Sequence, residues 1–74
     1  MDIDLINLVQ AEEKIALDQW GEFDTTPERL LNVVMEEVGE VAHAINHKEH
    51  LELIKQEIVE SIGVLSRLYD MVTA

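Results

Sequence analysis

Four glutamates stand out in the sequence because they form two pairs with the same spacing. Glu37 and Glu40 make the first pair, and Glu57 and Glu60 make the second. Residues three apart lie on one face of an α-helix, so each pair would present two neighbouring carboxylates. A set of oxygen ligands suits a hard divalent cation, Mg²⁺ or Mn²⁺, better than Zn²⁺. The spacing therefore predicts a metal site wherever helices bring the two pairs together.

The surrounding residues place both pairs on apolar helix faces. With about 100° per residue, Glu37 and Glu57 each lie at the centre of an apolar arc, and their partners lie about 60° to the same side. The arcs consist of Leu30, Val33, Val34, Val41 and Ala44 around Glu37, and of Leu53, Ile54, Val64, Leu68, Met71 and Val72 around Glu57. A helical bundle buries such arcs. Any one of these glutamates could instead lie at the border of a solvent-exposed helix face. Two pairs at equivalent positions on their helices favour a metal site.

Buried carboxylates that converge repel one another and lose hydration. The cost is several kcal/mol per ion unless the pKa values rise or a cation neutralises the charge. We therefore expect a bound divalent cation rather than four bare carboxylates.

Three helices are expected to position these residues. The first runs from about Asp4 to Trp20, where Gly21 would stop it. The second begins at Thr25-Thr26-Pro27-Glu28, either with Thr26 as the cap and Pro27 in first position or with a capping box from Thr25 to Glu28. It continues to about Asn46 or His47, and the third runs from about Leu51 to Val72.

The joint between the second and third helices is only Lys48-Glu49-His50. A joint this short makes the two helices an antiparallel hairpin, in which both glutamate pairs lie at similar distances from the turn. Apolar residues recur at intervals of three and four and do not alternate, which argues against strands. The predicted fold is an all-α single domain over residues 1–74, with a four-helix-bundle-like core completed by dimerisation.

Composition restricts the classes of partner. The chain has 74 residues, no cysteine, and 16 acidic against 5 basic residues, for a formal charge of −11. Such a charge excludes binding to a nucleic-acid backbone. No apolar run is long enough to cross a membrane, and Met1-Asp2-Ile3-Asp4 lacks the basic start of a signal peptide, so a cytoplasmic location is expected. The small size predicts a homodimer or a dimer of dimers.

The acidic motifs resemble those of a known family. Glu36-Glu37-Val38-Gly39-Glu40 followed by Glu57-Ile58-Val59-Glu60 is similar to the EExxE and ExxD signature of MazG-like all-α nucleoside triphosphate pyrophosphohydrolases. Trp20-Gly21-Glu22-Phe23 and Thr26-Pro27-Glu28-Arg29-Leu30 look like small phage-type and cassette-type members. The resemblance covers residues 17–72.

This resemblance implies hydrolysis of a nucleoside triphosphate to a monophosphate and pyrophosphate, as in nucleotide-pool housecleaning, by an enzyme that is a dimer or larger. By their places in the motifs, Glu37, Glu40 and Glu57 correspond to the residues that bind Mg²⁺ in the family. We expect Glu37 or Glu40 to act as the general base that accepts a proton from water. Glu60 stands where the family usually has Asp, and its extra methylene moves the carboxylate further from the helix axis. That departure keeps open a second class of function, a non-catalytic helical dimer that binds a partner.

Other candidate residues have a structural and a functional interpretation. Arg67 could bind a phosphate or pair with a carboxylate, and Trp20 could stack on a nucleobase or pack on a neighbouring helix. Arg29 is a weaker phosphate candidate. Glu40 and His43 have the spacing of the Glu-x-x-His element of di-iron bundles. A di-iron site needs a second such element, but no histidine follows Glu57 or Glu60 at that spacing.

Overall fold

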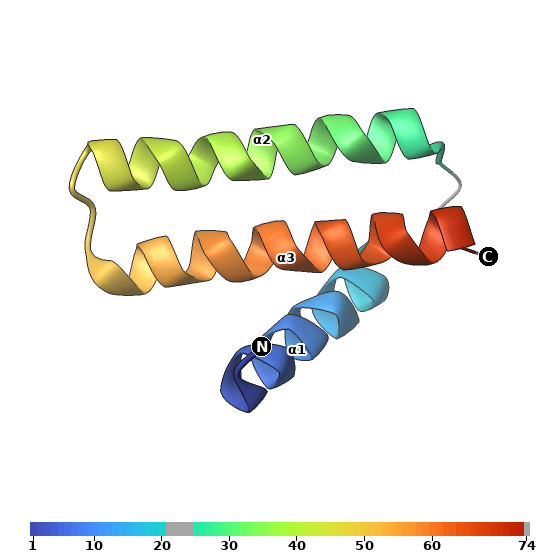
Figure 1. The fold of residues 1–74 in the computed structure, drawn as a ribbon, viewed down its shortest axis with the longest axis horizontal. Coiled ribbons are helices and arrows are strands. Elements are labelled where there is room, and N and C mark those ends of the chain that lie inside the picture. The colour runs from blue at the N-terminus through green and yellow to red at the C-terminus, as the bar shows by residue number, and fades with distance from the viewer. Residues whose placement is uncertain (21–24, 74) are drawn as a thin grey trace.

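The computed structural model describes residues 1–20 and 25–73, with the side chain of Trp20 outside that description. These residues form three helices, α1 (Ile3–Trp20), α2 (Pro27–Asn46) and α3 (Leu51–Thr73), which confirms the all-α prediction. Figure 1 shows α2 and α3 side by side and antiparallel, with α1 crossing α3 obliquely. The expected stop at Gly21 and the motif residues Glu22 and Phe23 lie outside the described residues.

The first helix begins one residue earlier than expected because Asp2, and not Asp4, lies at its start. The Asp2 carboxylate accepts a hydrogen bond from the backbone N–H of Asp4 at 2.7 Å, and the Asp2 carbonyl accepts one from Ile6 at 3.0 Å. A side-chain oxygen at this position satisfies a backbone donor that the helix itself cannot.

Of the two possible starts for α2, the structure shows the Thr26 cap. Thr26 has extended backbone angles, and its hydroxyl accepts a hydrogen bond from the N–H of Arg29 at 3.3 Å. Pro27 then occupies the first helical position, where its missing N–H costs nothing.

The turn between α2 and α3 is closed by hydrogen bonds to the last carbonyls of α2. Glu49 N–H donates to the Ala44 carbonyl at 2.9 Å, and Lys48 N–H donates to the Ile45 carbonyl at 3.1 Å. This Schellman pattern normally places glycine at the left-handed position, but here Lys48 adopts a φ of 53°. The turn therefore reverses the chain without the residue that usually marks such a reversal.

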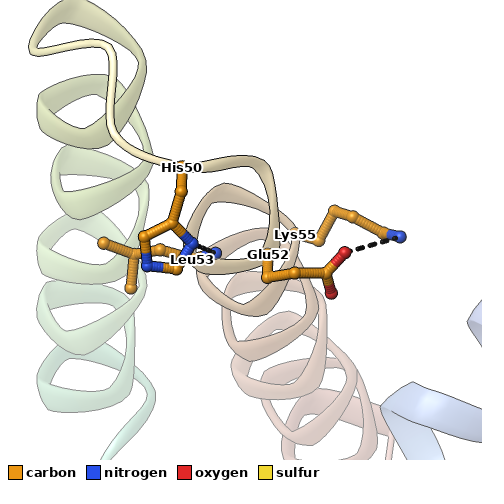
Figure 2. A network of polar contacts seen from close by, with 4 residues as sticks. All are labelled: His50, Glu52, Leu53 and Lys55. Atoms are coloured by element: carbon orange, nitrogen blue, oxygen red, sulfur yellow. Dashed lines mark hydrogen bonds and ion pairs between the residues drawn. The ribbon is translucent and has the colours of Figure 1, made fainter.

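The first turn of α3 is fixed by His50, as Figure 2 shows. Its Nδ1 accepts a hydrogen bond from the backbone N–H of Leu53 at 3.2 Å, which is the role of a capping side chain. One turn along, Lys55 Nζ lies 3.7 Å from Glu52 Oε1 in an exposed ion pair. Such surface pairs contribute little to stability, so the cap is the more important contact.

The core among the described residues is small. Its buried apolar side chains are Val9, Leu30, Val34, Ala44 and Val59. Two residues of the predicted buried arcs are instead exposed, Val33 by 38% and Val72 by 61%. Val33 lies on α2, with which α1 makes no comparable contact in the described part of the chain, and Val72 lies in the last turn of α3. No helix among the described residues is both long and apolar enough to cross a membrane.

Candidate metal centre

The hairpin brings the four glutamates into one cluster. Glu37 and Glu40 of α2 and Glu57 and Glu60 of α3 each offer a carboxylate oxygen, and these oxygens all lie within 4.8 Å of one another. Because the helices run antiparallel from one short turn, equal distances from the turn place the pairs opposite each other. The predicted convergence of the two pairs is therefore present in the fold.

Two oxygens in the acidic cluster have no hydrogen-bond partner among the described residues. Glu37 Oε2 and Glu57 Oε2 are both buried and unpaired. Buried polar atoms in folded proteins are nearly always satisfied, since an unpaired one costs about 1–3 kcal/mol. The cluster thus contains two acceptors for which the helices themselves supply no donor.

Both central carboxylates are shifted toward the protonated form. Burial raises the pKa of Glu37 to about 7, and the charges of Glu40 and Glu60 contribute to the same shift. Burial likewise raises the pKa of Glu57 to about 7, together with a side-chain hydrogen bond to Glu40 and the charge of Glu60. A cation would reverse this effect, because it stabilises the ionised carboxylates.

The acidic cluster fits a small divalent cation. Oxygens bound to Mg²⁺ lie about 2.0–2.1 Å from the ion, so two ligands on opposite sides of it are about 4 Å apart. A cluster whose oxygens span 4.8 Å is close to that size before any adjustment. The donor set is entirely oxygen, and its two orphaned atoms are free to ligate. The residues present therefore match Mg²⁺ or Mn²⁺ in both size and chemistry.

One side of the acidic cluster opens into a groove between the three helices, which we call the acidic groove. Its cavity volume is about 560 Å³, within the range of small-molecule sites. Its charged lining residues are Glu12, Glu13, Glu36, Glu37, Glu60 and Arg67, and the remaining walls are Ala16, Leu30, Val33, Gly63 and Val64. The groove therefore combines carboxylates, one guanidinium and an apolar wall.

Helix α1 contributes groove residues that the sequence reasoning missed. Glu12 packs against Gly63, where a Cβ would lie 3.6 Å from Glu12 Cγ. Gln56 Nε2 donates to Glu60 Oε1 at 3.1 Å and lies 3.5 Å from Glu12 Oε2, which links α1 to the cluster. One signal was present in the sequence, because Glu12 and Glu13 follow the buried Val9 by three and four residues and so share its face.

The predicted substrate-binding residues have different surroundings. Arg67 lines the groove, and burial lowers the pKa of its guanidinium while the charge of Glu13 raises it. Arg29 is exposed and does not line the groove. The predicted stacking of Trp20 concerns a side chain outside the described residues.

His43 does not join the acidic cluster. Its ring stacks on that of His47, with ring centroids 4.0 Å apart, and both side chains are exposed. The cluster is thus made of carboxylates alone, unlike the Glu-x-x-His arrangement of di-iron bundles.

Comparison with known proteins agrees with the geometry. The family model for the MazG nucleotide pyrophosphohydrolase domain matches residues 25–63, which is more than half of the chain. No curated protein and no solved structure matches the chain. The matched segment contains α2, the hairpin turn and all four clustered glutamates. The chain belongs to the MazG nucleotide pyrophosphohydrolase domain family.

Proposed function

We propose that this chain is a Mg²⁺-dependent nucleoside triphosphate pyrophosphohydrolase, with Mn²⁺ as an alternative cation. The observation that carries the proposal is the cluster of four carboxylates with two buried, unpaired oxygens in a chain of the MazG family. A cation held there would satisfy both oxygens. It would also face a groove large enough for a small ligand.

In this proposal Glu37, Glu40, Glu57 and Glu60 would hold the cation, which when bound would supply positive charge against the phosphates and a site for a water. Glu37 or Glu40 accepts the proton of that water through a carboxylate oxygen that does not ligate. The water oxygen bonds to the α-phosphorus as the bond from that phosphorus to the α,β-bridging oxygen breaks, or it bonds to the β-phosphorus as the bond from the β-phosphorus to the same oxygen breaks. The products are a nucleoside monophosphate and pyrophosphate, so atoms and charge balance without another reactant.

The groove supplies the remaining parts of the proposed site. Arg67 contacts a phosphate, because a guanidinium can donate two hydrogen bonds to phosphate oxygens. Leu30, Val33 and Val64 give the groove an apolar wall beside the acidic cluster. Arg29 and Trp20 remain weaker candidates at the periphery. The proposal treats residues 1–74 as one domain, acting as a homo-oligomer on the nucleotide pool of the cytoplasm.

The test is pyrophosphate release from a panel of ribo- and deoxyribonucleoside triphosphates, with Mg²⁺, with Mn²⁺ and with chelator. We expect release with metal, no release with chelator, and a loss of at least about 100-fold in Glu37→Gln. The matched control is Glu49→Gln, which removes one carboxylate from the exposed hairpin turn and should leave the rate unchanged. Metal binding without release from any nucleotide would favour the non-catalytic helical module.

A further inference from the structure

Two histidines lie side by side at the carboxyl end of α2, outside both the acidic cluster and the acidic groove. His43 and His47 are four residues apart, so their side chains lie on one face of the helix in successive turns. Their rings stack with centroids 4.0 Å apart and planes inclined by 26°, and both side chains are exposed to solvent. We call these two side chains the histidine pair. The proposed hydrolysis gives neither of them a role.

A hydrogen bond of His47 fixes which of its ring nitrogens carries the proton. Its Nδ1 lies 2.9 Å from the backbone carbonyl oxygen of His43. A carbonyl oxygen only accepts, so Nδ1 is the donor and the neutral ring keeps its lone pair on Nε2. Histidines that bind metals usually donate their other ring N–H to a carbonyl or a carboxylate, which fixes the tautomer and the orientation of the ring. His47 therefore has the tautomer of a metal ligand.

The histidine of the hairpin turn has the opposite tautomer. His50 Nδ1 accepts the backbone N–H of Leu53 at 3.2 Å, as Figure 2 shows. In the neutral ring the proton is then on Nε2. While this cap is intact, the ring has no lone pair left for a metal ion. The hydrogen bonds thus distinguish His50, which caps α3, from the histidine pair.

The separation of the paired rings suits two bonds to one ion. Zn–N bonds are about 2.0–2.1 Å long, so two imidazole nitrogens on a tetrahedral ion lie about 3.3 Å apart. Rings whose centroids are 4.0 Å apart are close to that separation before any adjustment. The same spacing of four residues places the two zinc-binding histidines of helical metalloprotease motifs on one face. The histidine pair therefore has the spacing and the proximity of a chelating pair.

The charges around the histidine pair favour a cation. The last carbonyls of a helix carry a partial negative charge, which attracts positive ions to its carboxyl end. Lys48 and Glu49 follow directly in the turn, and their charges oppose each other. Because the chain as a whole has a formal charge of −11, its overall field also attracts cations.

The donor atoms determine which ions the histidine pair would select. Imidazole nitrogens suit Zn²⁺, Cu²⁺ and Ni²⁺, whereas Mg²⁺ takes oxygen ligands. The acidic cluster offers only carboxylate oxygens, so the two places on α2 differ in the ions that they prefer. Two protein ligands leave the other coordination positions of a tetrahedral ion to water. Such an ion would be accessible from solvent and exchangeable.

We propose that His43 and His47 form a second metal site, which binds a transition-metal dication of the Zn²⁺, Cu²⁺ and Ni²⁺ class through Nε2 of His47 and a ring nitrogen of His43. The bound ion joins two successive turns of α2 and holds its carboxyl end in the helical conformation, next to the left-handed Lys48. The proposal depends neither on hydrolysis nor on a cation in the acidic cluster.

The first experiment is calorimetric titration with Zn²⁺ in the double variant Glu37→Gln, Glu57→Gln, so that the acidic cluster does not compete. We expect one ion per chain, with an affinity at least about tenfold lower when His43→Gln or His47→Gln is added, because chelation is lost. The matched control is His50→Asn, which removes a histidine but keeps a capping side chain and should bind as its parent does. No binding at millimolar Zn²⁺, or binding that only His50→Asn weakens, would overturn the proposal.

The second experiment uses the wild type, so it decides even if the double variant does not fold. Long-range ¹H–¹⁵N spectra of the histidine rings should show the proton on Nδ1 of His47 and on Nε2 of His50. Zn²⁺ should shift the ring signals of His43 and His47 and leave those of His50 in place, whereas Mg²⁺ should shift none of them. Zn²⁺ that leaves the paired rings unchanged, or the opposite tautomer at His47, would overturn the site.

Amide hydrogen exchange in the same samples tests the effect on the helix end. The backbone N–H groups of His47 and Lys48 donate to the carbonyls of His43 and Ile45 at 2.9 Å and 3.1 Å. An ion that joins the two turns should slow their exchange at least about threefold, because the last turn then opens less often. His43→Gln should remove the effect. Exchange rates that Zn²⁺ leaves unchanged would overturn the claim that the ion holds the end of α2.

Discussion

The side-chain amide of Gln56 donates a 3.1 Å hydrogen bond to Glu60, one turn further along α3. Glu60 stands where the family usually has Asp, so its carboxylate has one more rotatable bond to fix. The hydrogen bond restricts that side chain, and the Glu60 carboxylate offers an oxygen within 4.8 Å of those of the other three glutamates. Gln56 is therefore positioned to compensate for the longer side chain, as residues behind metal ligands commonly do.

Gln56→Ala is expected to weaken metal binding with little effect on the fold. Removing a residue that orients a ligand typically lowers metal affinity by about 10–100-fold. The hydrogen bond itself is exposed, so the metal-free melting temperature should hardly change. The measurement is the Mg²⁺ concentration that gives half of the maximal thermal stabilisation. Lys55→Ala is the control, and an unchanged midpoint in Gln56→Ala would show that Glu60 needs no orientation.

Glu57→Gln should stabilise the metal-free protein and abolish its response to Mg²⁺. An amide in place of this carboxylate removes a buried negative charge and can donate to Glu40 or Glu60, a gain of about 1 kcal/mol in the free energy of unfolding. The wild type should gain stability from millimolar Mg²⁺ by mass action, because the unfolded chain lacks the site. Thermal melts with and without Mg²⁺ measure both effects.

The matched variant for that comparison is Glu49→Gln, which removes a charge from the exposed turn. It should respond to Mg²⁺ as the wild type does. If Mg²⁺ still raises the melting temperature of Glu57→Gln, the cation binds at another site.

The metal-free protein should lose stability as the pH rises from about 4.5 to about 7. The pKa values of Glu37 and Glu57 are both raised to about 7 in the fold from an ordinary value of 4.5. Between these values the unfolded chain has lost the two protons that the folded chain keeps, so a rise in pH favours unfolding. Stability from this source is complete below pH 4.5 and is lost as the pH passes 7.

Urea unfolding at several pH values with chelator present measures this dependence. The double variant Glu37→Gln, Glu57→Gln should be less sensitive to pH over the same range, since neither side chain then titrates. If its slope equals that of the wild type, the pH dependence arises from the overall negative charge of the chain.

The sequence was sufficient for the parts of the fold that depend on local spacing. Helix boundaries came within one residue, because Thr26, Pro27 and the short joint are local signals. The convergence of the glutamates also follows locally, since a short turn fixes the register of α2 against α3. The contacts of α1 could not be predicted in the same way, because α1 packs against α3, which lies far from it in the sequence. Glu12 was missed for that reason, whereas the bond from Gln56 to Glu60 joins residues four apart on α3 and was a local signal that the prediction from spacing did not use.

Lys48 has a backbone conformation that could not be predicted from the sequence. Its left-handed backbone, with a φ of 53°, is normally marked by glycine, and lysine carries no such signal. Lys48→Gly should stabilise the protein by about 0.5–1 kcal/mol, because glycine adopts this conformation without strain from a Cβ. The midpoint of urea unfolding measures the gain, with Glu49→Gly as the control at a neighbouring exposed position. A loss of stability in Lys48→Gly would mean that chain flexibility outweighs the relief of strain.

The substitution of Glu60 separates the enzyme from the non-catalytic module. If Glu60 ligates Mg²⁺ in a working site, Glu60→Asp should retain or raise pyrophosphate release, since Asp is the residue that the family usually has there. Glu60→Gln should lower release by about 10-fold or more, because it removes a charge that the cation needs. In a site that no longer turns over, neither change affects release, and Glu60→Gln stabilises the metal-free fold by relieving repulsion with Glu37 and Glu57. Turnover across the nucleotide panel, measured beside thermal melts of all three proteins, therefore decides between the two functions.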